Sequence, residues 1–450
     1  MSFGTKWGKS PCGVAAATFL SVAILGTAAW AGPDSSEPLS VDECVRLALE
    51  NNHSLATAEA TLDRSSGSAK AAMRAILPNL RGNASWRQDN YREAKGGRVV
   101  DGVLYGGSDV FYNARISVRL TESLLDMEGL TNWRSRKADF GAARWDVNAT
   151  REDVEVSTRE QFYACLAAIK LAEVEENAIV VGAEQLRRAE TLFRLGSVAR
   201  SDVLQAQVNL AESEMNAINR RNAVRVEHSR LALVMGLDPR VDLQIDTTLL
   251  IPSDDPGGDV ESWISQALMN RPELVAARTR LRSAELAESA TKLGRLPTIG
   301  VEGSWSRSAT SRVDSYLRDV TAENNWTVGV GVSLTLFDGL SREGQIQSAV
   351  AEKRARQVAL DRQEKETSLQ VKDSFLSIRK ERESLRAAQT SVRLAEENLR
   401  LQQALYDTGA GTLLEWDNAR LDLRRARVFL VQAQINLVIS HIRFQKAAGK

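Results

Sequence analysis

Two acidic residues, Asp202 and Glu415, stand at matching places in two glycine-marked stretches of the chain. Residues 192–206 (LFRLGSVARSDVLQA) and 405–419 (LYDTGAGTLLEWDNA) align without a gap at an offset of 213 residues (405 − 192 = 213). In each stretch the acid follows the glycine by six residues (202 − 196 = 6 and 415 − 409 = 6). A carboxylate there can stabilise the first turn of a helix through the helix dipole, or attract cations where several carboxylates gather. Both roles suit the tip of a helical hairpin that occurs twice in the chain.

Other reactive side chains are few and scattered. The three histidines, His53, His228 and His441, do not lie within metal-ligand spacing of one another or of a cysteine. No glycine-rich phosphate loop and no nucleophile elbow occurs in the sequence. Cys44 and Cys165 lie in helical patterns and are too few for a disulfide framework, so we expect two buried thiols. The sequence therefore predicts neither an enzyme nor a bound cofactor.

The N-terminal segment has the pattern of an export signal. Lys6 and Lys9 precede an apolar run at Val14–Thr27, and Ala29-Trp30-Ala31 is a small-x-small cleavage site, so we expect residues 1–31 to be a signal peptide. An uncleaved membrane anchor is the alternative. No later segment has 18 continuous apolar residues, so an exported protein of this kind would have to cross a membrane as strands. The formal charge is +0, which gives no reason to expect nucleic acid as a partner.

The chain consists of two copies of one unit. Ala48-Leu49-Glu50-Asn51 matches Ala267-Leu268-Met269-Asn270 at an offset of 219 residues (267 − 48 = 219), before the tips match at 213. We therefore expect a first repeat at 32–236, a linker at 237–258 that is rich in Pro and Gly, and a second repeat at 259–450. Each repeat has the order helix, two strands, very long helix, tip and long helix.

The predicted strands alternate between apolar and polar residues over runs of about ten, as lipid-facing barrel strands do around a wet lumen. Polar loops are expected between the paired strands, at Asp89–Val110 and Arg307–Asn325. A soluble sandwich would show the same alternation and is the alternative. The residues expected to face lipid are Trp86, Tyr112, Ile116, Val118, Trp305, Trp326, Val328 and Val330.

Helical patterns account for most of the remaining chain. A helix is expected from Val41 to Ile76, and proline-free runs at 129–196 and 343–409 predict helices of about 100 Å each at ~1.5 Å per residue. Helices this long must pack sideways, and the returning helices carry a seven-residue seam typical of coiled coils. The seam residues are Leu210, Ala217, Val224 and Leu231, then Leu423, Leu430, Leu437 and Phe444, with Ala426, Ala433 and Ser440 between them.

Taken in order, these features resemble the TolC family of outer-membrane efflux proteins over nearly the whole chain after residue 31. The resemblance rests on the duplicated unit, the ALxNN-like openings, the Leu-Pro before each first strand, the LFDG at residues 336–339 and the glycine-marked tips. It implies a mainly α fold with a membrane β-barrel. Three chains would share a trimeric 12-stranded barrel, four strands from each, which a long α-helical coiled-coil tunnel continues into the periplasm.

The resemblance also implies a function. Such a protein is the passive exit duct of a tripartite efflux or type I secretion system in the bacterial outer membrane, opened at its periplasmic tip by an adaptor protein and an inner-membrane transporter. A non-channel periplasmic coiled-coil scaffold is the alternative. Matched to the family motif, the aperture residues are Asp202, Glu415, Asp417 and Asn418. Two positions after the second tip glycine, where the family has a basic residue, this chain has Gly411. The tips expected to contact the adaptor are Arg194, Leu195, Gly196, Ser197, Asp407, Thr408, Gly409, Ala410 and Gly411.

Overall fold

A computed structural model of the protein describes residues 38–92, 98–101, 103–105, 108–241, 243–249, 251, 257–312 and 321–449. The chain divides into two units, Met1–Pro38 and Leu39–Lys450, and every element below belongs to the second unit. The predicted signal peptide at 1–31 lies outside the described residues.

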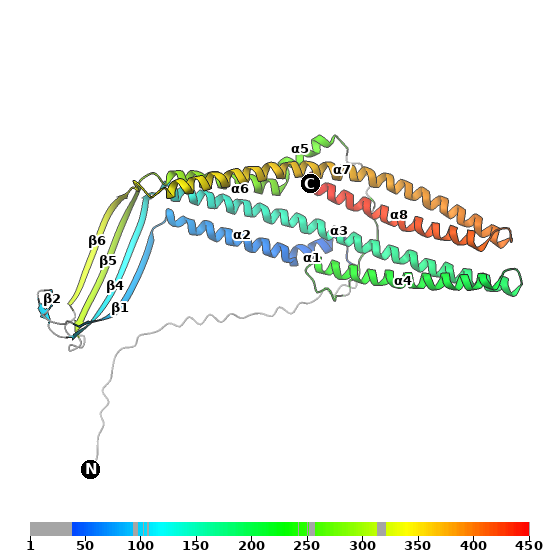
Figure 1. Ribbon diagram of the computed structural model, residues 1–450, viewed down its shortest axis with the longest axis horizontal. Coiled ribbons are helices and arrows are strands. Elements are labelled where there is room, and N and C mark those ends of the chain that lie inside the picture. Colours follow the sequence, from blue (N-terminus) through cyan, green and yellow to red (C-terminus); the bar gives the residue numbers. More distant parts are fainter. Residues whose placement is uncertain are drawn as a thin grey trace, which may run out of the picture. The chain divides into compact units, whose positions relative to one another are not determined.

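The two repeats share a succession of two helices, two long strands and a helical hairpin, and the first also contains a 3₁₀ turn and a short strand hairpin (Figure 1). The first contains α1 (Val41–Asn51), α2 (His53–Ala72), the 3₁₀ turn η1 (Met73–Ala75), β1 (Asn79–Arg92), β2 (Arg98–Val100), β3 (Val103–Tyr105), β4 (Ser108–Leu125), α3 (Met127–Arg194) and α4 (Arg200–Val234). The second contains α5 (Val260–Asn270), α6 (Pro272–Leu293), β5 (Thr298–Arg312), β6 (Thr321–Ser333), α7 (Ser341–Asp407) and α8 (Leu413–Ala448). The duplication read from the sequence is therefore visible as matched elements.

The opening helix of each repeat is broken, and the prediction of one helix from Val41 to Ile76 was wrong. Asn52 has extended backbone angles (φ −68°, ψ 128°), and its side chain caps α2 by accepting a hydrogen bond from the backbone N–H of Ser54 at 2.8 Å. The second repeat breaks at the equivalent residue, Arg271 (271 − 52 = 219), where Pro272 begins α6. A capping asparagine and a helix-starting proline are local signals for such a break. Ser40 caps α1 reciprocally with Glu43, as a helix start near Val41 requires.

Four antiparallel strands form one sheet in the order β1-β4-β5-β6. The strands contain 14, 18, 15 and 13 residues, longer than the expected runs of about ten. The predicted loop at Asp89–Val110 is correspondingly shorter and contains the β2–β3 hairpin, and the loop at Arg307–Asn325 loses residues to β5 and β6. Polar composition favoured loops there, but polar residues also continue one face of a sheet.

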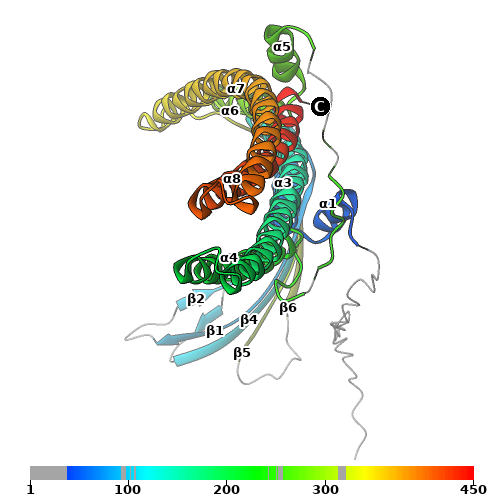
Figure 2. The ribbon, with the colours of Figure 1, turned by 90° about the vertical axis from the view of Figure 1, so that its right-hand side faces the viewer.

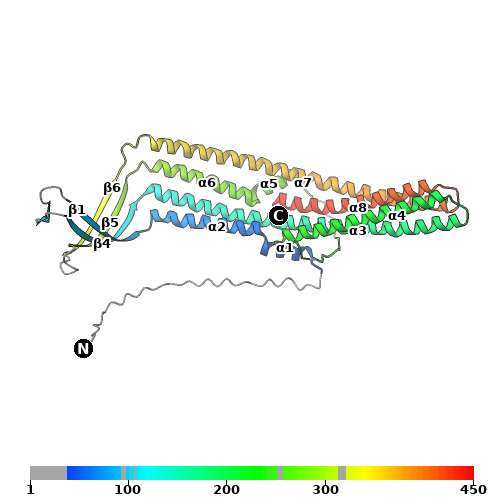
Figure 3. The same ribbon diagram turned by 60° about the horizontal axis from the view of Figure 1, so that its bottom comes forward.

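Helices continue from the sheet toward the two tips (Figure 1). Figure 2 looks along the helices from the tips and shows α4, α3, α8 and α7 side by side along a curve, in agreement with the pairwise contacts between them. Figure 3 shows α2, α3, α6 and α7 alongside one another between the sheet and the level of α1 and α5. None of the helices among the described residues is long and apolar enough to cross a membrane.

The predicted seam is where the helices pack. Leu423, Leu437 and Phe444 of α8 are buried, and Ala217 and Leu231 of α4 are buried as well. The intervening small residues, Ala426, Ala433 and Ser440, are also buried. The seam prediction is confirmed most fully for α8.

A second core gathers around α1. Cys44 and Cys165 are both buried in it and both free, and burial raises the pKa of each thiol to about 12. The segment predicted as a linker contributes to this core: Leu243 and Ile245 are buried, and Ile245 forms a bridge with Leu39. Residues 243–245 of the predicted linker are therefore packed against the first repeat, whereas Gly257 accepts a hydrogen bond from Trp263 of the second.

Candidate functional site

The sheet has one apolar and one polar face, set by its register. Residues that lie directly opposite in an antiparallel pair share a face. Val118 lies opposite Trp305, and Trp305 lies opposite Trp326. Trp86, Tyr112, Ile116, Val328 and Val330 are at even spacings from these residues on the same face. All eight residues that the sequence suggested would face lipid are thus on one face.

That apolar face is uncovered in the single chain. Trp326, Val328 and Val330 are 74%, 70% and 71% exposed. Trp86 stacks on Tyr112 with ring centroids 5.5 Å apart, which groups aromatic rings on the same surface. A contiguous apolar surface of this kind marks an interaction with a membrane or with another protein.

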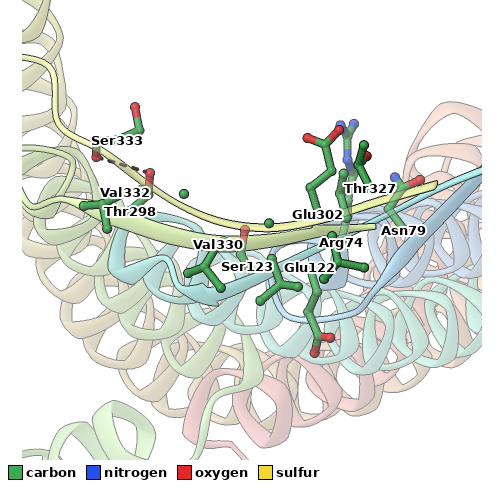
Figure 4. A pocket seen from close by; sticks show the side chains of 16 residues that line it. Arg74, Asn79, Glu122, Ser123, Thr298, Glu302, Thr327, Val330, Val332 and Ser333 are labelled. Atoms are coloured by element: carbon green, nitrogen blue, oxygen red, sulfur yellow. Dashed lines mark hydrogen bonds between the residues drawn. The ribbon is translucent and has the colours of Figure 1, made fainter. Parts of the chain in front are cut away.

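The opposite face is polar and hollowed. Figure 4 shows Glu302, Thr327 and Ser333 directed to one side of the sheet, and Val330 and Val332 to the other. The hollow holds about 640 Å³ near the end of the sheet that joins the helices, and Arg74 of η1 also lines it. Arg119 forms an ion pair with Glu302 at 3.2 Å on this face. The sheet can therefore separate an apolar medium from water.

The two edges of this sheet are open. β1 and β6 are the outer strands, and each pairs on one side with a described strand of the sheet. Strands of 14 and 13 residues are long for uncovered edges, which natural proteins cover, shorten or close into a barrel. The sheet needs further strands from another copy of the chain, or another cover.

The first tip connects α3 to α4 through a Schellman turn. Gly196 has φ +76°, the Ser197 N–H donates to the Leu192 carbonyl at 2.9 Å, and the Gly196 N–H donates to that of Phe193 at 2.9 Å. Ala199 precedes α4 and offers no side-chain cap. Asp202 is half-buried in the first turn of α4. The backbone of this tip is fixed, while the start of α4 is unsupported by a capping side chain.

The second tip repeats the turn and adds a cap. Gly409 has φ +75°, and the Ala410 N–H donates to the Leu405 carbonyl at 2.9 Å. Thr412 and Glu415 form a capping box at the start of α8, and the hydrogen bonds from Thr412 lower the pKa of Glu415. A Cβ added at Gly411 would lie 3.0 Å from the Leu405 Cβ, so a larger residue there would displace Leu405.

The structure places the predicted aperture residues in different surroundings. Glu415 and Asn418 are exposed on α8, but Asp417 is only 8% exposed and does not lie on an open surface. Its carboxylate accepts hydrogen bonds from Gln185 Nε2 at 2.6 Å and from Asn209 Nδ2 at 2.7 Å. Those amides belong to α3 and α4. Asp417 therefore joins the second hairpin to the first, a role that differs from the exposed aperture acid we expected.

Two more contacts support the second tip. Tyr406 stacks on Trp416 with ring centroids 5.1 Å apart, which ties the end of α7 to the start of α8. Arg188 of α3 reaches Asp407 at 3.3 Å and so links the hairpins again. Sequence reasoning missed Tyr406, Trp416, Gln185 and Asn209. Trp416 could have been found by extending the seam back seven residues from Leu423.

The turns themselves are accessible. Arg194, Leu195, Gly196 and Ser197 are exposed in the first tip, Asp407, Thr408, Gly409 and Ala410 are exposed in the second, and Gly411 is half-buried. Among the residues that the structure describes, no group of three His, Cys, Asp or Glu side chains could hold a metal ion. The candidate site is therefore the two-faced sheet together with the paired tips.

Known proteins with this organisation share sequence and fold with the chain. Residues 44–237 and 263–450 match the family described as outer membrane efflux protein. The chain is 23% identical to protein CyaE of Bordetella pertussis, over 57% of this chain and 53% of CyaE. It is 23% identical to the outer membrane efflux protein BepC of Brucella suis, over 74% of this chain and 72% of BepC. The chain thus spans about half the length of CyaE.

The fold has solved counterparts. The crystal structure of the CmeC outer membrane channel of Campylobacter jejuni superposes with a TM-score of 0.79 at 18% identity, covering 91% of this chain and 85% of CmeC. At that identity, the likeness establishes the fold alone.

Proposed function

This chain belongs to the outer membrane efflux protein family, and we propose that three copies of it form the passive exit channel of an efflux or type I secretion system. One observation carries the proposal: a four-stranded sheet with an apolar face, a polar face and two open edges. Four strands are too few to close around a lumen, whereas three copies would give twelve strands and remove every edge.

In such a channel the apolar face contacts the lipid of the outer membrane, and the polar face lines the lumen. The helices extend the duct into the periplasm. The turns at Arg194–Ser197 and Asp407–Gly411 contact a periplasmic adaptor, which couples the channel to an inner-membrane transporter. The protein carries out no catalysis. Its contribution is a continuous water-filled path, with energy supplied by the transporter.

The tips form the aperture of this path. Asp202 and Glu415 begin matching helices and are not buried in the chain, so three copies would place six carboxylates around the opening. A ring of carboxylates favours cations. Asn418 is exposed beside them, whereas Asp417 holds the hairpins together from within.

The test is conductance of the purified full-length protein in planar bilayers under a KCl gradient. We expect conductance with cation preference, and we expect Asp202→Asn with Glu415→Gln to move the reversal potential toward zero. Glu59→Gln removes one exposed acid from α2 and serves as the control for lost charge. An unchanged reversal potential in the double variant would contradict the acidic aperture, and a protein without conductance would contradict the channel.

A further inference from the structure

Arginines gather on the polar face of strands β1 and β4. Arg81 lies directly opposite Arg119, and Arg115 is four residues from Arg119 on the same face of β4. Arg87 lies opposite Asn113 on that face as well. All four arginines are exposed. Like charges directly opposite in a sheet destabilise it, so the Arg81–Arg119 pair needs a compensating negative charge.

The acids of the same face compensate only part of this charge. Glu302 pairs with Arg119 at 3.2 Å. Asp89 accepts a hydrogen bond from Asn113 at 2.7 Å, and Glu323 lies on β6, opposite Ser308 of β5. Within the described part of the chain, Arg81, Arg87 and Arg115 make no ion pair. Strands β1 and β4 therefore hold a surplus of positive charge.

The geometry of this surplus suits an anionic ligand. Side chains directly opposite in an antiparallel pair have Cβ atoms about 5 Å apart, so two guanidinium groups can reach one small anion. Guanidinium presents a planar fork of donors that matches carboxylate and phosphate oxygens in pairs. Arg74, in η1, adds a further cation beside the hollow of the same face.

We propose that Arg81, Arg119 and Arg115 form an anion-binding belt on the polar face of the sheet, which takes multivalent solutes bearing carboxylate or phosphate groups. The belt rests on the proposed channel function, in which this face lines the lumen. It would make the sheet end of the duct receptive to anions, although the tips carry carboxylates. Cargo molecules with several negative groups would then bind on their way out.

Citrate serves as the probe because it carries three carboxylates. We expect citrate, added to the compartment on the sheet side of full-length channels in planar bilayers, to reduce KCl conductance in a saturable manner. Arg81→Gln with Arg119→Gln should raise the half-blocking concentration by about tenfold or more, because paired charge-assisted hydrogen bonds are lost. Arg81→Lys with Arg119→Lys keeps the charge but loses the planar fork of donors. Its half-blocking citrate concentration should lie between those of the unchanged protein and the double Gln variant.

Arg307→Gln is the matched control, since Arg307 is exposed on the apolar face of β5, opposite Ile116. Citrate should block the Arg307→Gln channel at the same half-blocking concentration as the unchanged protein. Conducting channels that citrate does not block, or a double Gln variant blocked like the unchanged protein, would overturn the belt and leave the channel standing. An equal shift from Arg307→Gln would overturn the assignment to the polar face. Channels that fail to conduct would overturn the proposed function, and citrate calorimetry on the same variants would then decide whether the belt binds anions.

Discussion

The two helical tips share a backbone and differ in what their side chains do. Both turn through a glycine with φ near +75°, 213 residues apart. In the second tip, Tyr406 is 6% exposed and Asp417 is 8% exposed, while their counterparts in the first tip, Phe193 and Leu204, are 44% and 52% exposed. The duplication therefore preserved the turn, and the burial of the residues around it diverged.

Because of this difference, the two tips make different contacts. A small core of buried residues, Tyr406, Leu413 and Trp416, lies in the second tip. Leu192 and Val198 of the first tip pack against it, and Asp417 also ties the second tip to the first hairpin. The first tip leaves apolar side chains such as Phe193 and Leu195 uncovered and available to another chain. Because the second hairpin is held by buried polar contacts, changes there should affect the tips far more than changes at equivalent positions of the first.

The largest difference is expected from the aromatic pair. Trp416→Ala should destabilise the second tip by about 3 kcal/mol, because it deletes a buried ring that stacks on Tyr406. Val203 is the counterpart of Trp416 (416 − 203 = 213) and is half-buried, so Val203→Ala should cost under about 1 kcal/mol. Hydrogen–deuterium exchange of peptides covering each tip measures the loss of local stability in both variants. Equal exchange in the two variants would mean that the tips are energetically alike.

The polar link should give the next effect. Asp417→Ala leaves Gln185 and Asn209 without their acceptor, and we expect a loss of about 2 kcal/mol in the local stability that joins the hairpins. The matched change Leu204→Ala removes an exposed side chain and should lie within about 0.5 kcal/mol of the unchanged protein.

Limited proteolysis and exchange of residues 180–210 would show whether the first hairpin loosens when the second is altered. A Leu204 variant that loosens the tips more than the Asp417 variant would reverse the assigned roles.

The smallest effect is expected at the cap of α8. Thr412→Ala should cost about 1 kcal/mol, whereas α4 begins after Ala199 without a side-chain cap to lose. The folded state lowers the pKa of Glu415, so its contribution is present above the ordinary pKa of 4.5 and is lost as pH falls through the lowered folded value.

After correction for the intrinsic exchange rate at each pH, the protection of α8 amides against exchange should therefore fall on acidification more than the protection of α4 amides. Glu415→Gln keeps the capping geometry but does not titrate, so it should remove this part of the pH dependence. A pH response that persists unchanged in Glu415→Gln would place its origin elsewhere.

Periodic and local signals allowed much of this fold to be predicted. The alternation along the strands predicted the apolar face, because a shift of one residue would have turned Trp305 and Trp326 to opposite sides of the sheet. The left-handed turns fall on the tip glycines that the sequence marks, since few other residues adopt such turns at low cost. The helix break at Asn52 was also encoded locally, but the apolar pattern continued across it and concealed it.

Other features depended on how the hairpins pack. Asp417 and Glu415 differ by two positions on one helix, which is enough to turn one carboxylate toward α3 and leave the other exposed. Spacing along one sequence does not say which face of α8 meets the other hairpin. Gln185 and Asn209 are polar residues at buried contacts, so no apolar pattern marks them. Their roles follow only from the placement of α3, α4 and α8 together.

The most direct test of the channel is the mass of the detergent-extracted protein, measured by light scattering with the detergent contribution subtracted. Three chains per particle, extracted only with detergent, is the result expected if β1 and β6 close a shared barrel. A water-soluble monomer or dimer that needs no detergent would contradict the channel. It would favour the periplasmic coiled-coil scaffold instead.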